Sequence, residues 1–189
     1  VGEDQKQHVE LSRDIAARFN RIYGETFVIP EPVIPAVGGR VMGLNDPSIK
    51  MSKTYSHVRG HAIRMLDEPK EIERSFMRAV TDSGNEIRFS DDPDKSGVNN
   101  LLGIYRVVTG KSEEEVEKEF QMARGYGDLK KAVAEVVINE LSPIRERYNE
   151  LISDVVELDR LLAVGAEQAS AVSEPKLAEM KEKMGLVLS

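Results

Sequence analysis

Apolar residues recur at helical spacing near the start of the chain and again through most of its second half. The first stripe runs from Leu11 to Ile22 and stops just before Gly24, a residue that can take the left-handed conformation found at helix ends. Asp4 and Gln7 stand three positions apart, which is close to a capping box. The pattern predicts a first helix that ends at Tyr23.

Between residues 26 and 44 the pattern changes to short β-branched and aromatic runs. Pro30 and Pro32 interrupt these runs, and Gly38 and Gly39 follow. Proline lacks the N–H that an inner strand needs, so it is confined to sheet edges. We therefore expect short extended segments at the edge of a sheet over residues 26–29, 33–35 and 40–44.

From about His57 onwards helical spacing dominates. The sequence predicts the following elements: a short helix through Ala62, Ile63 and Leu66; a helix opened by Pro69; a brief strand over residues 87–89; a helix that stops at Thr109-Gly110; a helix capped by Ser112 and Glu115; a long helix capped by Asp128 and kinked or restarted by Pro143; and a tail interrupted by Pro175, with Gly185 as its C-cap. The expected fold is mostly α with a small α/β part.

Composition narrows the classes of protein that this chain can represent. Its 189 residues are 40% hydrophobic and 31% charged, which is typical of an ordinary folded domain and can bury a sizeable core. The absence of cysteine excludes disulfides and thiolate metal sites and fits a reducing compartment. No apolar run approaches the roughly 20 residues that span a bilayer, so we expect neither membrane insertion nor a signal peptide. The net charge of −7 argues against a broad basic surface for nucleic acid.

The sequence Lys50-Met51-Ser52-Lys53 is the strongest candidate for chemistry. It follows a turn-forming segment, Asn45 to Ser48. A loop of this kind can place two ammonium groups, a hydroxyl and backbone N–H groups around a polyphosphate. A pair of lysines three positions apart is also common on solvated surfaces, so this motif alone leaves both interpretations open.

The other polar candidates are ambiguous or weak. Asp4 can cap the first helix, or it can accept hydrogen bonds from the hydroxyls of a bound sugar. His57 and His61 stand four positions apart, but no third ligand accompanies them, so we expect a solvated pair and no metal site. The basic residues around the long predicted helix can contact RNA phosphates, but acidic neighbours over residues 113–119 equally favour a solvated, salt-bridged surface.

Several blocks, taken in order along essentially the whole chain, resemble bacterial tryptophanyl-tRNA synthetases. Lys50-Met51-Ser52-Lys53 indicates class I synthetases in general, and two downstream blocks narrow the resemblance to the tryptophan enzyme. The blocks are Gly2-Glu3-Asp4-Gln5, Arg40-Val41-Met42, Lys50-Met51-Ser52-Lys53, Ala79-Val80-Thr81-Asp82-Ser83, Gly97-Val98-Asn99-Asn100-Leu101-Leu102 and Met184-Gly185-Leu186.

The resemblance implies the C-terminal portion of a Rossmann-like catalytic domain over residues 1–55 and a helical anticodon-binding bundle over residues 56–189. It allows the last helices to pack back on the catalytic part. It implies activation of tryptophan with ATP and Mg²⁺, transfer to tRNA(Trp), a homodimer and a cytoplasmic location. The implied catalytic residues are Lys50, Ser52 and Lys53. The implied ATP-binding residues are Gly2, Glu3, Asp4, Val41, Lys50, Met51, Ser52, Lys53 and Thr54, and Gln5 is implied to lie near the amino acid.

The chain also departs from the family pattern. Thr54 stands where many relatives have serine, and the segment from Tyr55 to His61 differs from the expected Asp-Pro-rich stretch, which puts the movement of the loop in doubt. No H-I-G-H motif is present. We therefore expect a C-terminal portion that is inactive by itself. Two rival functions remain: a non-catalytic helical module that binds tRNA or protein, and a relative of tyrosyl-tRNA synthetase.

Overall fold

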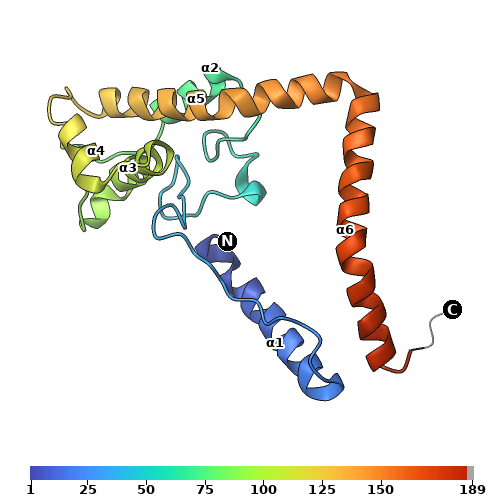
Figure 1. The fold of residues 1–189 in the computed structure, drawn as a ribbon. Coiled ribbons are helices and arrows are strands. Elements are labelled where there is room, and N and C mark those ends of the chain that lie inside the picture. The colour runs from blue at the N-terminus through green and yellow to red at the C-terminus, as the bar shows by residue number, and fades with distance from the viewer. Residues whose placement is uncertain (187–189) are drawn as a thin grey trace. The chain divides into compact units, whose positions relative to one another are not determined.

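The computed structural model describes residues 1–186 and is mostly helical, which confirms the expected fold class (Figure 1). In chain order, the elements are the 3₁₀ turn η1 (Glu3–Gln5), α1 (Lys6–Tyr23), the 3₁₀ turn η2 (Lys53–Tyr55), α2 (Pro69–Met77), the 3₁₀ turn η3 (Pro93–Lys95), α3 (Ser96–Thr109), α4 (Glu113–Glu119), α5 (Tyr126–Ser153) and α6 (Val155–Lys183). None of the helices in this described part is long and apolar enough to cross a membrane.

The chain divides into two compact units. One comprises residues 1–34 together with those from Tyr148 onwards, and the other comprises Pro35–Arg147. The boundary between residues 55 and 56 that the resemblance implies is a functional division, and it stays a prediction. Each unit is described separately below.

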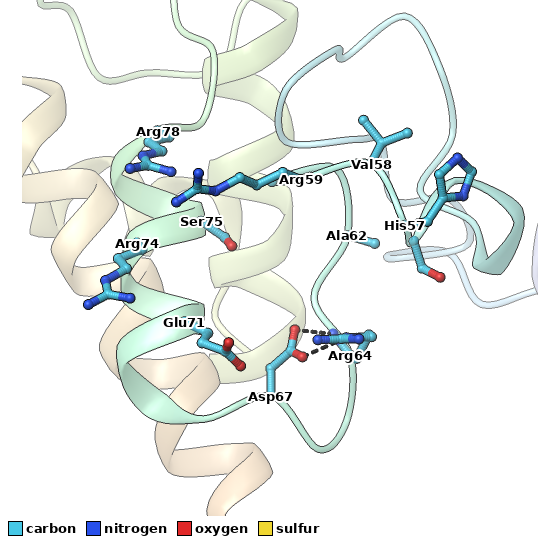
Figure 2. A pocket seen from close by; sticks show the side chains of 12 residues that line it. His57, Val58, Arg59, Ala62, Arg64, Asp67, Glu71, Arg74, Ser75 and Arg78 are labelled. Carbon is cyan, nitrogen blue, oxygen red and sulfur yellow. Dashed lines mark hydrogen bonds and ion pairs between the residues drawn. The ribbon is translucent and has the colours of Figure 1, made fainter.

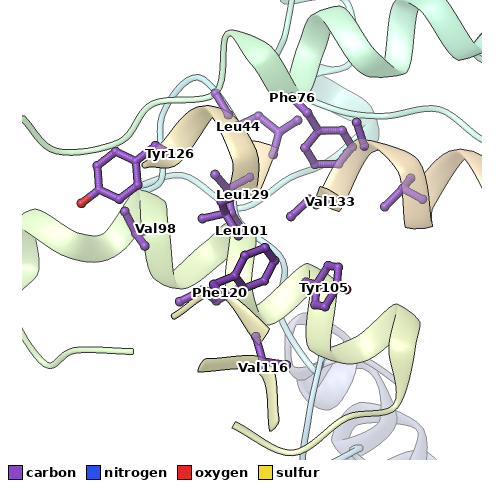
Figure 3. Close-up of a cluster of buried hydrophobic side chains, with 14 of the residues drawn as sticks. Leu44, Phe76, Val98, Leu101, Tyr105, Val116, Phe120, Tyr126, Leu129 and Val133 are labelled. Carbon is purple, nitrogen blue, oxygen red and sulfur yellow. The ribbon is translucent and has the colours of Figure 1, made fainter. Parts of the chain in front are cut away.

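Helices α2, α3, α4 and the first turns of α5 surround the core of unit Pro35–Arg147 (Figure 3). Phe76 of α2, Leu101 of α3 and Leu129 of α5 are fully buried there. Each such side chain contributes about 1.5–3 kcal/mol relative to an exposed position. Leu44 is also buried in this core. It precedes the motif Lys50-Met51-Ser52-Lys53, whose two lysines are called the signature lysines below, and it anchors the loop that carries them to the core.

Local capping signals predicted three helix ends correctly. Pro69 is in the first turn of α2, and Glu68 and Glu71 form a capping box there. Ser112 and Glu115 form the predicted capping box of α4. Gly110 ends α3 with a left-handed φ of 70°. These devices involve only neighbouring residues, so the sequence alone identifies them.

Two predicted caps are displaced. Asp4 lies inside η1, and the N-cap of α1 is Gln5, which makes no side-chain capping bond. Helix α5 begins at Tyr126, so Asp128 is in its first turn, where its carboxylate accepts a hydrogen bond from the backbone N–H of Arg124 at 2.8 Å. Asp128 therefore stabilises the start of α5 without being its N-cap.

The predicted strands at residues 26–29, 33–35 and 87–89 do not pair with any other strand in residues 1–186. The described chain has one isolated antiparallel bridge, between Met42 and Lys50. Around Phe27 a side chain replaces the strand partner, because Asn20 Oδ1 accepts from the N–H groups of Thr26 and Phe27 and Asn20 Nδ2 donates to the Phe27 carbonyl. The prediction failed because a strand depends on a partner that local sequence does not specify.

The helix predicted through Ala62 and Leu66 is also absent. Residues 57–68 form turns, including one in which His61 N–H donates to the Val58 carbonyl at 3.1 Å and Gly60 has a φ of +74°. A positive φ at the third position makes this a type II turn, which is incompatible with a helix. The apolar pattern is explained instead by Ile63, which packs against the core from a non-helical backbone.

Helix α5 does not restart at Pro143, and α6 is not interrupted at Pro175 as the sequence predicted. Both α5 and α6 continue through their prolines. Each proline removes one hydrogen bond to the carbonyl four residues earlier, at Asn139 and Ala171. Both of those residues are exposed, so water can satisfy the released carbonyl groups.

In the other unit, the loop after α1 is joined to the end of α6. Lys176 and Lys183 donate to the Thr26 carbonyl at 2.8 Å and to Thr26 Oγ1 at 2.9 Å, respectively. Hydrogen bonds from the same two lysines lower the pKa of Glu179 to about 2. Gly185 is left-handed after the last turn, and the N–H of Leu186 reaches the Lys181 carbonyl, so the predicted C-terminal stop is present.

Helix α3 approaches the backbone before it so closely that Gly97 has no room for a side chain. A Cβ atom on Gly97 would lie 2.1 Å from the carbonyl oxygen of Val80. We expect Gly97→Ala to lower the free energy of unfolding by about 1–3 kcal/mol, because backbone atoms have to move. Urea denaturation of the chain measures this change.

Gly103→Ala is the matched control on the same helix. A Cβ atom at Gly103 meets nothing within 4 Å. Alanine is the better helix former, so this variant is expected to be about 0.5–1 kcal/mol more stable than the original chain. Equal effects of the two substitutions would contradict the close approach at Gly97.

Candidate functional site

The signature lysines extend from the return arm of a tight hairpin in unit Pro35–Arg147. Gly43 N–H donates to the Ile49 carbonyl at 2.8 Å, and Met51 N–H donates to the Val41 carbonyl at 2.9 Å. The predicted turn closes this hairpin, since Asp46 Oδ1 accepts from Ser48 N–H and Oγ at 2.9 and 2.6 Å. Hydrogen bonds from Ser48 lower the pKa of Asp46, which keeps this carboxylate charged as an acceptor. Lys50 thus begins in a defined backbone position.

The side chain of Asn100 forms hydrogen bonds with the hairpin arm that contains Met42. Asn100 Oδ1 accepts from the N–H of Met42, and Asn100 Nδ2 donates to the Met42 carbonyl, both at 2.9 Å. This is the pair of bonds that a neighbouring strand would form. Asn99 makes the same two-bond contact with the backbone of Ser90, at 3.1 and 2.6 Å. The two asparagines of the Gly97–Leu102 block therefore hold two separate loops on α3.

The Ala79–Ser83 block forms a second support. Val80 N–H donates to the Leu44 carbonyl at 2.7 Å, and the Val80 carbonyl lies against Gly97. Asp82 accepts from Tyr126 Oη at 2.8 Å and is 3.2 Å from Lys95 Nζ. Burial tends to raise the pKa of Asp82, but hydrogen bonds from Tyr126, Gly84 and Lys95 outweigh it and lower the pKa. The block thus connects the hairpin, α3 and the start of α5.

His61 fills the inside of the hairpin, contrary to the prediction of a solvated pair. It is 3% exposed, whereas His57 is exposed. His61 Nδ1 is 2.8 Å from Asn45 Oδ1, and Nε2 is 3.2 Å from the carbonyl oxygen of Lys50. A carbonyl only accepts, so Nε2 is the donor in the second contact. The ring therefore joins the turn of the hairpin to its first signature lysine.

Two further contacts make His61 integral to the hairpin. A Cβ atom on Gly43 would lie 2.4 Å from His61 Cε1, so the glycine provides the space that the ring occupies. Leu44 N–H donates to the His61 carbonyl at 3.0 Å, and the Tyr55 ring lies 5.5 Å from the imidazole, centroid to centroid. Sequence reasoning missed this role because the spacing of His57 and His61 suggests one helical face, and no local signal distinguishes the buried member.

The remaining signature residues surround an open hollow of about 450 Å³, lined by Met51, Ser52, Lys53, Ser56, Ala62, Ile63, Arg64 and Met65. Ser52 is extended and leads into η2, which contains Lys53 and Thr54. Lys53 and Thr54 are exposed. Within residues 1–186, the ammonium of Lys53 has no hydrogen-bond or ion-pair partner, so it is available to an incoming anion.

The predicted ATP- and substrate-binding residues fall in both units. Val41 is held beside Met51 by the hairpin and lines a separate hollow of about 330 Å³. Gly2, Glu3, Asp4 and Gln5 form the turn that leads into α1 in the other unit, where Gln5 Nε2 donates to Asp4 Oδ2 at 3.2 Å. The structure thus groups Val41 with residues 50–54 and keeps residues 2–5 together, and the binding role of each group stays a prediction.

The model of the family "tRNA synthetases class I (W and Y)" matches residues 1–142. The chain belongs to this family. A curated relative from Wolinella succinogenes, named tryptophan–tRNA ligase, is 50% identical over 187 residues, which is 99% of this chain and 56% of the relative. The chain therefore spans about half the length of the curated relatives it matches.

Solved synthetase structures share the fold. The crystal structure of tryptophanyl-tRNA synthetase from Mycoplasma pneumoniae matches with a TM-score of 0.86 at 31% identity, covering 99% of this chain and 55% of that one. The Campylobacter jejuni enzyme, described as complexed with ADP and tryptophan, matches with a TM-score of 0.66 at 31% identity, covering 98% and 56%. These matches confirm the likeness to class I synthetases that the sequence blocks indicated.

Proposed function

We propose that this chain is part of a tryptophan–tRNA ligase and supplies the signature loop that acts on ATP. The observation that carries the proposal is the exposed Lys53 ammonium beside Ser52, on a loop whose preceding arm is held by His61 and Asn100. Identity of 50% to a relative named tryptophan–tRNA ligase supports tryptophan as the amino acid.

In the proposed reaction the carboxylate of tryptophan attacks the α-phosphate of ATP, and pyrophosphate leaves. Negative charge then builds up on the departing phosphates. Lys50 and Lys53 are the proposed cations that stabilise this charge, and Ser52 adds a hydroxyl donor beside them. Because the loop positions charges and forms no covalent bond, no side-chain nucleophile is needed. The first step leaves tryptophanyl-adenylate, and a hydroxyl at the 3′ end of tRNA(Trp) then attacks its carbonyl carbon, so that AMP leaves.

The nucleotide contacts of Gly2, Glu3, Asp4, Val41, Met51 and Thr54, and the contact of Gln5 with the amino acid, are part of the same proposal. The printed description of the Campylobacter jejuni relative names ADP and tryptophan as its ligands, which supports binding of both molecules. Residues 1–186 contain no group of three His, Asp or Glu side chains that could hold a metal. We propose that Mg²⁺ enters with ATP, because this ion is usually held by substrate phosphates together with one or two carboxylates.

The homodimer and the cytoplasmic location are further parts of the proposal. Leu11, Ile15 and Ile22 of α1 are 58%, 61% and 55% exposed, and exposed apolar stripes of this kind mark interaction surfaces. This stripe supports the proposed homodimer. The division into a catalytic part up to residue 55 and an anticodon-binding part, and a cytoplasmic location, follow from the family resemblance.

Amino-acid-dependent exchange of pyrophosphate into ATP tests the proposal, using the protein expressed from its complete coding sequence. We expect exchange with tryptophan and at least about 10³-fold less with tyrosine, because a site built for one polar aromatic group rejects another strongly. Exchange that depends on tyrosine would assign the chain to the other branch of the family. Loss of exchange with both amino acids, in a folded protein that still binds tRNA, would support the non-catalytic module.

A further inference from the structure

A second hollow, of about 320 Å³, adjoins the signature loop in unit Pro35–Arg147 (Figure 2). It lies between the turns that follow η2 and one face of α2. Ser56, Ala62 and Arg64 line both this hollow and the one beside Lys53, so the two hollows are neighbours. We call this second hollow the arginine cavity.

The arginine cavity has an excess of positive charge, with Arg59, Arg64, Arg74 and Arg78 against Asp67 and Glu71. Arg64 is neutralised, since its Nε is 2.6 Å from Asp67 Oδ1 and its backbone N–H donates to Asp67 Oδ2. Glu71 is engaged in the capping box of α2. The other three arginines line the cavity without an ion-pair partner in the described chain, and Glu71 is the one acidic side chain of the lining that remains to offset them.

Arg59, Arg74 and Arg78 make no hydrogen bond or ion pair with any residue that the structure describes. Figure 2 shows the Arg59 side chain pointing toward α2, and Arg59, Arg74 and Arg78 all line the same hollow. Bringing like charges together is unfavourable unless an anion joins them, so the arrangement suits a ligand with several negative charges.

The backbone fixes the position of each of these arginines. Arg59 is the second residue of the type II turn that Gly60 permits, and the turn ends at the buried His61. Arg74 belongs to α2, and Arg78 is its C-cap, one helical turn further on. Residues at this spacing lie on one helix face, with their Cβ atoms about 5–6 Å apart. The cavity is thus built on an anchored turn and a helix end.

We propose that the arginine cavity binds consecutive phosphates of an RNA backbone. This inference rests on the proposed function, which makes the RNA the tRNA substrate. An open row of exposed arginines matches a polymer with regularly spaced charges, whereas Lys50 and Lys53 are the cations proposed for the smaller triphosphate. Since the chain as a whole is acidic, a local basic site also determines where RNA docks.

The test is the double variant Arg74→Ala/Arg78→Ala, with Arg59→Ala as a second, independent variant. In the protein expressed from its complete coding sequence, we expect the KM for tRNA in aminoacylation to rise about tenfold, and the slope of tRNA affinity against salt to fall by about one for each phosphate contact removed. Exchange of pyrophosphate in the absence of tRNA is expected to stay within about twofold of the original rate. Lys70→Ala, which removes an exposed charge from α2 outside the cavity, is expected to change neither quantity.

Fluorescence anisotropy with labelled tRNA(Trp) transcript separates this inference from the proposed function. If the original protein activates no amino acid, the proposed function fails, but weaker transcript binding by the arginine variants still supports the cavity. Unchanged tRNA binding and salt slope in both variants would overturn the inference. An increase in the KM for pyrophosphate or ATP, with tRNA binding unaffected, would also overturn it by assigning the cavity to the nucleotide.

Discussion

Replacing Lys53 by alanine is expected to slow tryptophan-dependent pyrophosphate exchange by about 10²–10³-fold, the usual effect of removing one group that stabilises transition-state charge. The affinity for tryptophan is expected to change far less, because the ammonium interacts with charge that develops only as pyrophosphate leaves. Lys53 is exposed and without a partner in the described chain, so its removal leaves the packing of the hairpin intact. Exchange kinetics and equilibrium binding of tryptophan, measured on the same preparation, check both parts.

The matched control for Lys53 is Lys118→Ala, which removes an exposed lysine from α4 in the same unit. It is expected to leave exchange unchanged and so to exclude a general effect of net charge. Equal exchange rates for Lys53→Ala and the original protein would remove Lys53 from the proposed mechanism.

Replacing His61 by alanine is expected to affect both stability and activity. The substitution leaves a cavity inside the hairpin and removes the donor to the Lys50 carbonyl, which together cost about 2–4 kcal/mol of unfolding free energy. Because Lys50 then loses its fixed backbone position, we expect the exchange rate to fall by about 10–100-fold even at temperatures where the protein stays folded. Urea denaturation and exchange at several temperatures measure the two effects.

His57→Ala provides the control for His61, because His57 is exposed and only four positions away. Its unfolding free energy is expected to stay within about 0.5 kcal/mol of the original value. His61→Asn and His61→Gln retain an N–H donor, and partial recovery of exchange by either one would show that the contact with Lys50 matters in addition to packing. If His61→Ala and His57→Ala behave alike, His61 does not position the loop.

The two blocks that narrow the family resemblance, Ala79–Ser83 and Gly97–Leu102, hold the hairpin in place through hydrogen bonds and close packing. The Asn100 side chain bonds the backbone N–H and carbonyl of Met42, and the N–H of Val80 donates to the Leu44 carbonyl. Gly97 permits the close contact between α3 and the Val80 carbonyl. The hairpin therefore reaches its position through residues 30 to 60 positions further along the chain, and none of them has to touch a ligand.

The sequence by itself determined the features that depend on neighbouring residues. Pro69, Gly110 and the capping box of Ser112 and Glu115 marked ends of α2, α3 and α4, because these signals involve only residues within four positions of one another. The signature Lys50-Met51-Ser52-Lys53 was likewise recognisable as a motif, since its chemistry depends on residue types in a short order. The mostly helical fold followed from apolar spacing over whole helices.

Only the tertiary structure decided which polar side chains are buried and what they hold. His61 has the same local pattern as the exposed His57, but it is enclosed because Gly43, Asn45 and Lys50 surround it from the hairpin. The strands predicted around Phe27 and Met42 lack strand partners on those sides because the side chains of Asn20 and Asn100 bond their backbones instead. The helix predicted after residue 56 is replaced by the type II turn at Gly60. Long-range partners, which local propensity does not contain, therefore determine how the signature lysines are presented.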